Sequence, residues 1–243
     1  TGNIANIAGP NDETSASQDW NISGDLDLDE LIVPHSTQDA SKLEFDFLPL
    51  ATEGQFRFLF ASEEYLEYTQ PEFAFLNDAF GFFINGTNYS NENIALVPDT
   101  NFPISVQTIN DVSNSAYYIN NPTGNLDIEF DGYTTVLTAT VENLVPCEWY
   151  SIKLVIADAS DGNLDSAVFL AANSFTAGQS VFVDAFVDAH LMKFDVSDDL
   201  SLELRPSLEF NSFQSGAIST SFSGGLSLQL RFRADQKLTP PPF

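Results

Sequence analysis

The sequence is poor in the residues that most often carry redox, metal-thiolate or acid–base chemistry. Its 243 residues include one cysteine, Cys147, and two histidines, His35 and His190. One cysteine excludes an intramolecular disulfide and a thiolate metal cluster. The histidines lie far apart in the sequence, and His190 follows a strand-like pattern, so neither is a good candidate for a general base.

Sequence motifs of the common catalytic classes are absent as well. We find no nucleophile elbow, zinc-protease motif, phosphate-binding loop or dinucleotide fingerprint. Carboxylate pairs of the kind that glycosidases use are plentiful, but 35 acidic residues make such pairs expected by chance. We therefore assign no catalytic residues and expect a protein that is not an enzyme.

Basic residues are scarce, and the charge is unevenly distributed. Eight Lys and Arg stand against 35 Asp and Glu, a net charge of −27, and residues 1–192 hold 29 acidic but only three basic residues. A nucleic acid or an anionic membrane surface is therefore not an expected partner, because no basic face exists to neutralise phosphates. No run of residues is apolar enough for membrane insertion. So many carboxylates repel one another, and bound cations would relieve that repulsion.

Aromatic residues and alternating apolar patterns are abundant instead. The chain has 22 Phe and 43% apolar residues. Residues 41–50 and 54–65 alternate apolar with polar residues, and residues 78–86 read as a third strand that ends in the turn signal Asn85-Gly86. The only candidate for a short helix is "GDLDLDELI". The pattern predicts an all-β protein, an antiparallel β-sandwich of the jelly-roll type.

The pattern changes after about residue 178, which predicts two regions. Residues 1–178 form the sandwich, and residues 179–243 form a β-rich extension. Within the extension, leucines alternate around Leu202 and Leu228, which predicts additional long C-terminal strands. About sixty residues make a marginal independent core, so the extension needs a neighbour to pack against.

The segment "VIADASDGNLDSAVF" (155–169) places several carboxylates in a turn between two apolar strands. Asp158, Asp161 and Asp165 supply oxygen ligands within one loop that Gly162 allows to tighten. Ca²⁺ prefers six to eight such oxygens. The alternative is a solvated acidic hairpin with no bound ion.

Two further acidic pairs lie at strand ends, in "FASEEYLEY" and "FLNDAFGFF". If the three clusters converge at one rim of the sandwich, their repulsion needs a cation. The sequence therefore predicts a Ca²⁺ site built from Glu63, Glu64, Asp78, Asp158, Asp161 and Asp165.

Several stretches together resemble one known family, the choice-of-anchor L domain. They are "FRFLFASEEYLEY", "LNDAFGFFI", "NIALVPDTNFPISVQTIN", "FDGYTTVLTA" and "VPCEWYSIKLVIADASDGNLDSAVFLAANSF". The resemblance runs in order from Thr1 to about Phe175 and does not extend to residues 179–243. It implies a bacterial protein that is exported and displayed at the cell surface, without catalytic residues. The family's usual N-terminal strand is missing here, and the opening "TGNIANIAGPN" reads like the middle of a domain, so we expect further sequence before Thr1.

Two function classes follow. One is a structural or adhesive surface protein that associates with itself or with other surface proteins. The other is a Ca²⁺-dependent carbohydrate-binding module, for which an exposed aromatic residue is the discriminating feature. We expect Trp149 and Cys147 in the core, which leaves Trp20, in a polar loop, as the better sugar contact.

The extension suggests how self-association would occur. A sheet that lacks a strand has an open edge, and a strand from a neighbouring subunit can fill it. Head-to-tail filling does not close and produces a filament. The alternative is that residues 179–243 pair within their own subunit.

Overall fold

The computed structural model describes residues 1–13, 15–69, 77–122, 126–172 and 174–177, and beyond them the backbone of five strands between residues 182 and 231. Nearly all of the described regular structure is β. The strands of the main body are β1 (Thr37–Leu48), β2 (Gly54–Ser62), β3 (Ala79–Gly86), β4 (Tyr89–Asn93), β5 (Ile104–Ser105), β6 (Tyr118–Asn120), β7 (Gly132–Thr134), β8 (Leu137–Val141), β9 (Tyr150–Ala159) and β10 (Ser166–Leu170). The helical elements are η1 (Ile4–Ile7), α1 (Leu26–Leu31) and η3 (Ser115–Tyr117).

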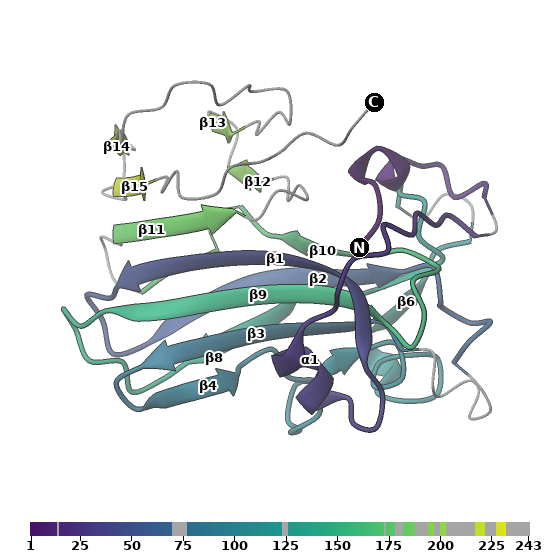
Figure 1. Cartoon of the computed structure of the whole chain (residues 1–243), viewed down its shortest axis with the longest axis horizontal. Coiled ribbons are helices and arrows are strands. Elements are labelled where there is room, and N and C mark those ends of the chain that lie inside the picture. Colours follow the sequence, from purple (N-terminus) through teal and green to yellow (C-terminus); the bar gives the residue numbers. More distant parts are fainter. Residues whose placement is uncertain are drawn as a thin grey trace.

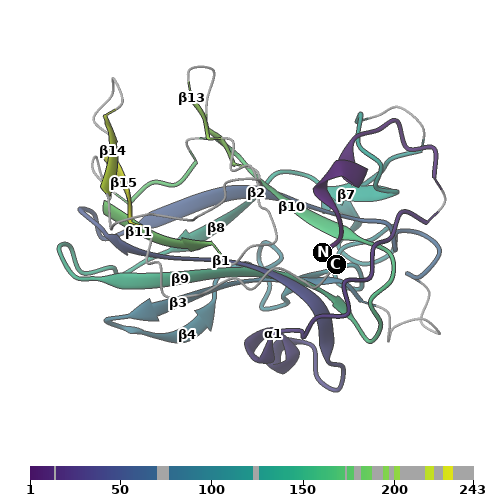
Figure 2. The same ribbon diagram turned by 45° about the horizontal axis from the view of Figure 1, so that its top comes forward.

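The strands form two antiparallel sheets that lie one above the other (Figures 1 and 2). The first sheet has the order β11-β1-β9-β3-β4, with β5 paired to β3, and β11 (Phe182–Val187) comes from the C-terminal extension. The second has the order β10-β2-β7-β6, with β8 paired to β2. The predicted all-β sandwich is confirmed.

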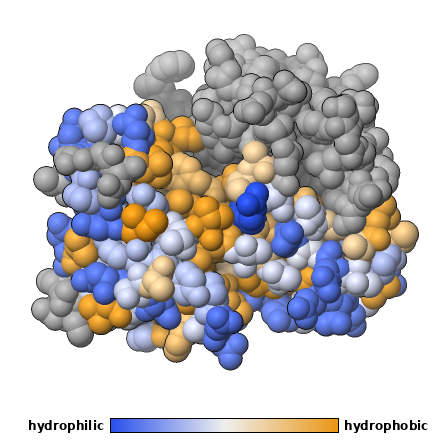
Figure 3. All heavy atoms as spheres, turned by 180° about the vertical axis from the view of Figure 1, so that it is seen from behind, coloured by the Kyte–Doolittle hydropathy of each residue, from blue (hydrophilic) through white to orange (hydrophobic). Residues whose placement is uncertain are grey.

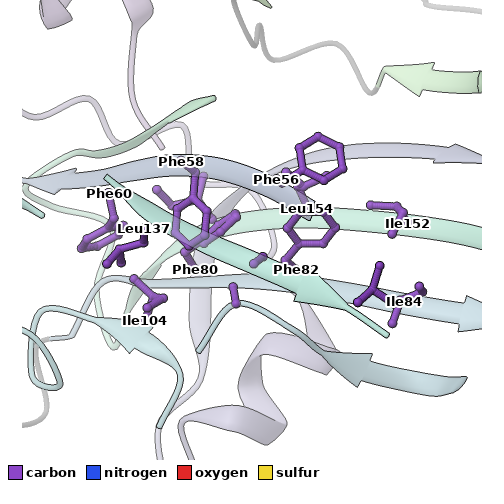
Figure 4. Close-up of a cluster of buried hydrophobic side chains, with 14 of the residues drawn as sticks. Phe56, Phe58, Phe60, Phe80, Phe82, Ile84, Ile104, Leu137, Ile152 and Leu154 are labelled. Carbon is purple, nitrogen blue, oxygen red and sulfur yellow. The ribbon is translucent and has the colours of Figure 1, made fainter. Parts of the chain in front are cut away.

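The core between the sheets comes directly from the alternation in the sequence. On β2, every second residue, Phe56, Phe58 and Phe60, is buried against the opposite sheet. Phe80 and Phe82 of β3 meet them, with ring centroids 5.1 Å apart for Phe58 and Phe80 (Figure 4). Offset and tilted aromatic packing of this kind adds to the stabilisation from apolar burial.

The outer face of each sheet is also covered. Helix α1 buries Leu28 against Val155 and Ala157 on the outer face of the first sheet. On the second sheet, Phe130 and Ala61 form a smaller cluster beneath the N-terminal segment. Residues one position apart on a strand therefore face two different buried environments.

Helix α1 is held by a network of ion pairs. Its N-cap, Asp25, accepts hydrogen bonds from the backbone N–H groups of Asp27 and Leu28. Lys42 and Lys153 each lie 2.7 Å from one Asp25 carboxylate oxygen. Burial raises the pKa of Asp25, but the two ammonium groups lower it by more than burial raises it. The net shift of the pKa is therefore downward.

The C-terminal extension contributes short strands. They are β11 (Phe182–Val187), β12 (Phe194–Val196), β13 (Leu200–Leu202), β14 (Ala217–Ser221) and β15 (Ser227–Arg231). Strand β11 pairs antiparallel with β1, from Leu43 opposite Val187 to Leu48 opposite Phe182. Strands β12 and β13 form one hairpin-like pair, and β14 and β15 another.

Three local expectations need correction. The turn between β3 and β4 is formed by residues 87 and 88, because Gly86 still pairs with Tyr89. Cys147 is exposed, not buried: it has φ +66° in the turn that precedes β9, where its N–H bonds to the carbonyl of Pro49. Trp149 in the same turn is 58% exposed, because the strand that buries its neighbours begins only at Tyr150.

Candidate functional site

Strand register brings acidic residues into opposite positions at one end of the sandwich. Strands β3 and β9 pair with Ala79 opposite Ala157, so the next residues, Asp78 and Asp158, face each other. Residues opposite each other in antiparallel strands have Cβ atoms about 5 Å apart. In the second sheet, Ser62 lies opposite Ser166, which brings Glu63 opposite Asp165. The Glu63 N–H donates to the Asp165 carbonyl at 3.1 Å.

The two acidic pairs point to different faces. Asp78 and Asp158 continue the rows of Phe80 and Ile156, whose side chains lie in the core between the sheets. Glu63 and Asp165 continue the rows of residues on the outer face of the second sheet. We call Ser62, Glu64, Asp78, Asp158 and Ser166 the inner group, and Glu63, Glu129, Asp131 and Asp165 the outer group.

A chain of hydrogen bonds links the two sheets within the inner group. The Ser62 hydroxyl donates to Asp78 Oδ2 at 2.8 Å, and the Glu64 N–H donates to the Ser62 hydroxyl at 3.0 Å. The Asp78 N–H in turn donates to Glu64 Oε2 at 3.0 Å. The carboxylates are therefore fixed in position by neighbours from both sheets.

Four oxygens of the inner group remain unsatisfied. Asp78 Oδ1, both carboxylate oxygens of Asp158 and the hydroxyl of Ser166 are buried without a well-formed hydrogen bond. Looser contacts of Asp78 with Ser166 and of Asp158 with Thr1 lower the pKa of the two carboxyls in part. Asp78 is 0% and Asp158 1% exposed. Buried polar atoms are nearly always paired, and an unpaired charge costs more than an unpaired neutral group.

Electrostatics in the inner group favour the neutral, protonated form in the absence of another cation. Burial and then the charge of Asp78 raise the pKa of Asp158 to about 9, although the nearby amino and hydroxyl groups of Thr1 lower it in part. Burial and Asp78's neighbour Glu64 likewise raise the pKa of Asp78. Burial raises the pKa of Glu64 to about 8 against the lowering effect of its hydrogen bond from Asp78.

The outer group fastens part of the N-terminal segment to the second sheet. Three of its carboxylates accept hydrogen bonds from that segment, namely Glu129 from the Glu13 N–H (2.7 Å), Asp131 from the Asn11 side chain (3.0 Å) and Asp165 from the Gln18 N–H (3.0 Å). Glu63 is the exception: it is 2% exposed, and neither carboxylate oxygen has a partner. Burial, followed by repulsion from Asp131, raises its pKa to about 9.

Basic side chains do not balance these carboxylates. Where side chains are described, the chain has three basic residues, Lys42, Arg57 and Lys153. Both lysines are paired with Asp25, and Arg57 is exposed on β2. The Thr1 amino group lowers the pKa of Asp78, Asp158 and Asp165 in part, and protons or an external cation would offset the charge that remains.

A cavity of about 420 Å³ adjoins both groups. It lies between the N-terminal segment and β10, and its lining includes Asp165, Ser166 and Ile156. The Thr1 nitrogen donates to the Ser166 carbonyl at 2.5 Å at its edge. Asp165 is the outer-group carboxylate in its lining, whereas Asp78 and Asp158 are not among the lining residues.

The six residues that the sequence predicted as Ca²⁺ ligands are thus divided. Glu64, Asp78 and Asp158 come together in the inner group, whereas Glu63 and Asp165 belong to the outer group. Asp161 is partly exposed in its loop and accepts the N–H of Asn163 at 3.0 Å. Among the described residues, no three Asp, Glu, His or Cys side chains converge closely enough to hold one metal ion as they stand.

Sequence reasoning missed several members of both groups. Glu129 and Asp131 flank Phe130 in "LDIEFDGY", and this alternation of acidic and apolar residues is the signal that marks them. The serines of the inner group carry no signal of their own, because only the strand register places them beside Asp78.

Comparisons with known proteins give two family matches. The model of the choice-of-anchor L domain matches residues 1–176. The model of a family of unknown function (DUF5683) matches residues 163–232. No curated protein and no solved structure matches the chain.

Proposed function

The chain belongs to the choice-of-anchor L domain family, and from this premise we propose that it is a structural module of the bacterial cell surface. The family itself points to a bacterial surface-associated protein and is typically not enzymatic. The match over residues 1–176 is the observation that carries the proposal. A sandwich closed by a large aromatic core suits a load-bearing role, since its rigidity comes from packing.

The properties of the described surface agree with an exposed setting. The chain carries a net charge of −27, which favours solubility and repels the protein from anionic surfaces. On the face seen in Figure 3, hydrophobic and hydrophilic residues intermingle. Among the described residues there is no helix with the length and hydrophobicity needed to cross a bilayer.

Surface labelling of intact bacteria tests the location. Antibodies raised against the purified chain should label unpermeabilised cells of the source organism, and external protease should remove the label. Labelling only after permeabilisation would contradict a surface role. An antibody to a cytoplasmic protein, applied to the same cells, serves as the control for cell integrity.

We further propose that the module assembles by strand exchange into a filament. Support comes from β11, whose backbone pairs with the edge of β1 over residues 43–48. The same edge would accept β11 of a second copy, because backbone pairing does not depend on which subunit supplies the strand. Head-to-tail exchange of this kind leaves one strand and one edge free at the ends and so continues.

A designed disulfide separates exchange from pairing within one subunit. Asp46 and Asp184 are opposite in the β1–β11 register. The variant Asp46→Cys with Asp184→Cys, in a Cys147→Ser background, should give a ladder of linked subunits on a non-reducing gel. The single variant Asp46→Cys is the control for random collision. If the disulfide forms only within single chains, with no linked dimers or larger species, exchange is refuted and the strand belongs to its own subunit.

A carbohydrate-binding module is the second candidate, and exposed tryptophans favour it. Trp20 is 41% exposed and lies beside the acidic end, where its backbone N–H donates to the Asp39 carboxylate at 2.6 Å. Trp149 is exposed at the opposite end of β9. A glycan array on the purified chain, repeated with Trp20→Ala and Trp149→Ala, tests this function. Binding that neither substitution weakens would exclude a tryptophan-based sugar site.

A further inference from the structure

We propose that the inner group holds one divalent cation between Asp78 and Asp158, inside the sandwich, and that Ca²⁺ is the ion it fits. The two carboxylates are opposite across β3 and β9, and both are fully buried. This inference depends on the proposed surface location in one respect only, namely that the cell exterior supplies the Ca²⁺. It replaces the single six-residue rim site with a smaller one.

Unsatisfied oxygens are the observation that points to an ion. Asp78 contributes one, Asp158 two and Ser166 one, all buried and without a well-formed hydrogen bond. They come from both sheets. The described Lys and Arg side chains are paired elsewhere or exposed, which leaves the Thr1 amino group as a partial source of positive charge. A cation satisfies all four atoms at once, which a single water molecule with two donor hydrogens does not.

The chemistry of the donors selects the ion. They are oxygens only, with neither histidine nor cysteine in the inner group, which disfavours zinc and copper. Two carboxylates with hydroxyls make an irregular set of mixed charge. Ca²⁺ accepts such sets and completes its shell with water or backbone carbonyls, whereas Mg²⁺ demands near-octahedral geometry. Two carboxylates also agree with the absence of any converging set of three among the described residues.

The ion would link the two sheets at this end of the sandwich. Asp78 and Asp158 belong to the first sheet, while Ser62 and Ser166 belong to the second. The Ser62 hydroxyl already joins the sheets through Asp78 Oδ2. A cation shared by Asp158, Asp78 and Ser166 adds a second link, and the native state alone offers it. Binding should therefore raise the melting temperature.

Protons are the competing explanation, and a charge-neutral substitution separates the two. Asp158→Asn keeps the shape of the side chain but removes its charge. Without metal the natural chain must protonate Asp158 at neutral pH in order to bury it, and the variant avoids that free-energy cost. The variant should therefore melt at a higher temperature than the natural chain. With Ca²⁺ the order should reverse, because the variant has lost a ligand.

The experiment measures Ca²⁺ binding by calorimetry and melting of the purified chain at pH 7.5, in excess chelator and in Ca²⁺. We expect one saturable Ca²⁺ site, at least tenfold weaker in Asp158→Asn and in Asp78→Asn. Added Mg²⁺ should compete for it only weakly. Asp99→Asn, at an exposed position with φ +62°, is the matched control and should bind as the natural chain does.

Two results would overturn the site. One is the absence of saturable Ca²⁺ binding together with equal melting in chelator and in Ca²⁺, which leaves protons as the compensating charge. The other is binding that survives both substitutions, which places the ion elsewhere. Neither depends on where the protein resides, so a failed surface-labelling test leaves this inference standing.

Discussion

The pH dependence of stability in the absence of divalent cations follows from the buried carboxylates. Burial raises the pKa values of Glu63 and Asp158 to about 9 and of Glu64 to about 8. In the unfolded chain these groups titrate near 4. Between these values the folded state binds more protons than the unfolded state, so stability falls as pH rises. The stabilisation is complete below about pH 4 and is lost through pH 8 to 9.

The size of the effect is set by the number of pH units crossed. Each unit within the window is worth up to about 1.4 kcal/mol per group, so the change from pH 5 to pH 8 reaches about 4 kcal/mol for one independent group. Mutual repulsion makes the groups titrate together and spreads the change. For a chain of this size about 4 kcal/mol corresponds to roughly 10 °C in melting temperature.

Urea unfolding in excess chelator, at pH 5, 6, 7 and 8, measures this slope. Glu63→Gln removes one titrating group and should flatten the slope, whereas Asp99→Asn should leave it unchanged. Stability that is level or rises from pH 5 to pH 8 in chelator would refute the reasoning.

Three further outcomes are expected from other parts of the molecule. Cys147 should react with a thiol reagent at the rate of an exposed thiol in the native protein, and protection until unfolding would contradict the exposed turn. Lys153→Met should lower the free energy of unfolding by about 3 kcal/mol in urea titrations, because it leaves buried Asp25 with one cation instead of two. An unchanged midpoint would mean that the ion pairs of Lys153 with Asp25 and Asp27 contribute nothing to stability. Phe82→Ala should cost about 3–5 kcal/mol, since its ring fills the core between the sheets, and a loss below 1 kcal/mol would contradict that packing.

The sandwich could be predicted from the sequence because burial on strands leaves a period of two. Phe56, Phe58 and Phe60 recur at every second position, and the structure buries all three. The short helix was also predictable, since Asp25 precedes an apolar turn in the manner of an N-cap. The turn at residues 145–149 was not, because Cys147 and Trp149 look apolar while their backbone has not yet entered β9.

The candidate site was predictable in composition but not in arrangement. Acidic residues at strand ends indicated that carboxylates would gather, and Glu64, Asp78 and Asp158 do so. The division into two groups depends on which face each residue occupies, and a shift by one residue reverses the face. Glu63 and Glu64 are adjacent in sequence and therefore belong to opposite sides of the second sheet. Register between distant strands, such as β3 with β9, decides the rest.

The most direct test of the buried cation site is a crystal structure of the chain grown with Ca²⁺, with anomalous data that locate the ion. The account predicts one anomalous peak between the carboxylates of Asp78 and Asp158, with oxygen ligands at about 2.4 Å. Crystals of Asp158→Asn grown in the same solution should lack the peak. A structure in which these two carboxylates share a proton, with no peak between them at any Ca²⁺ concentration, would contradict it.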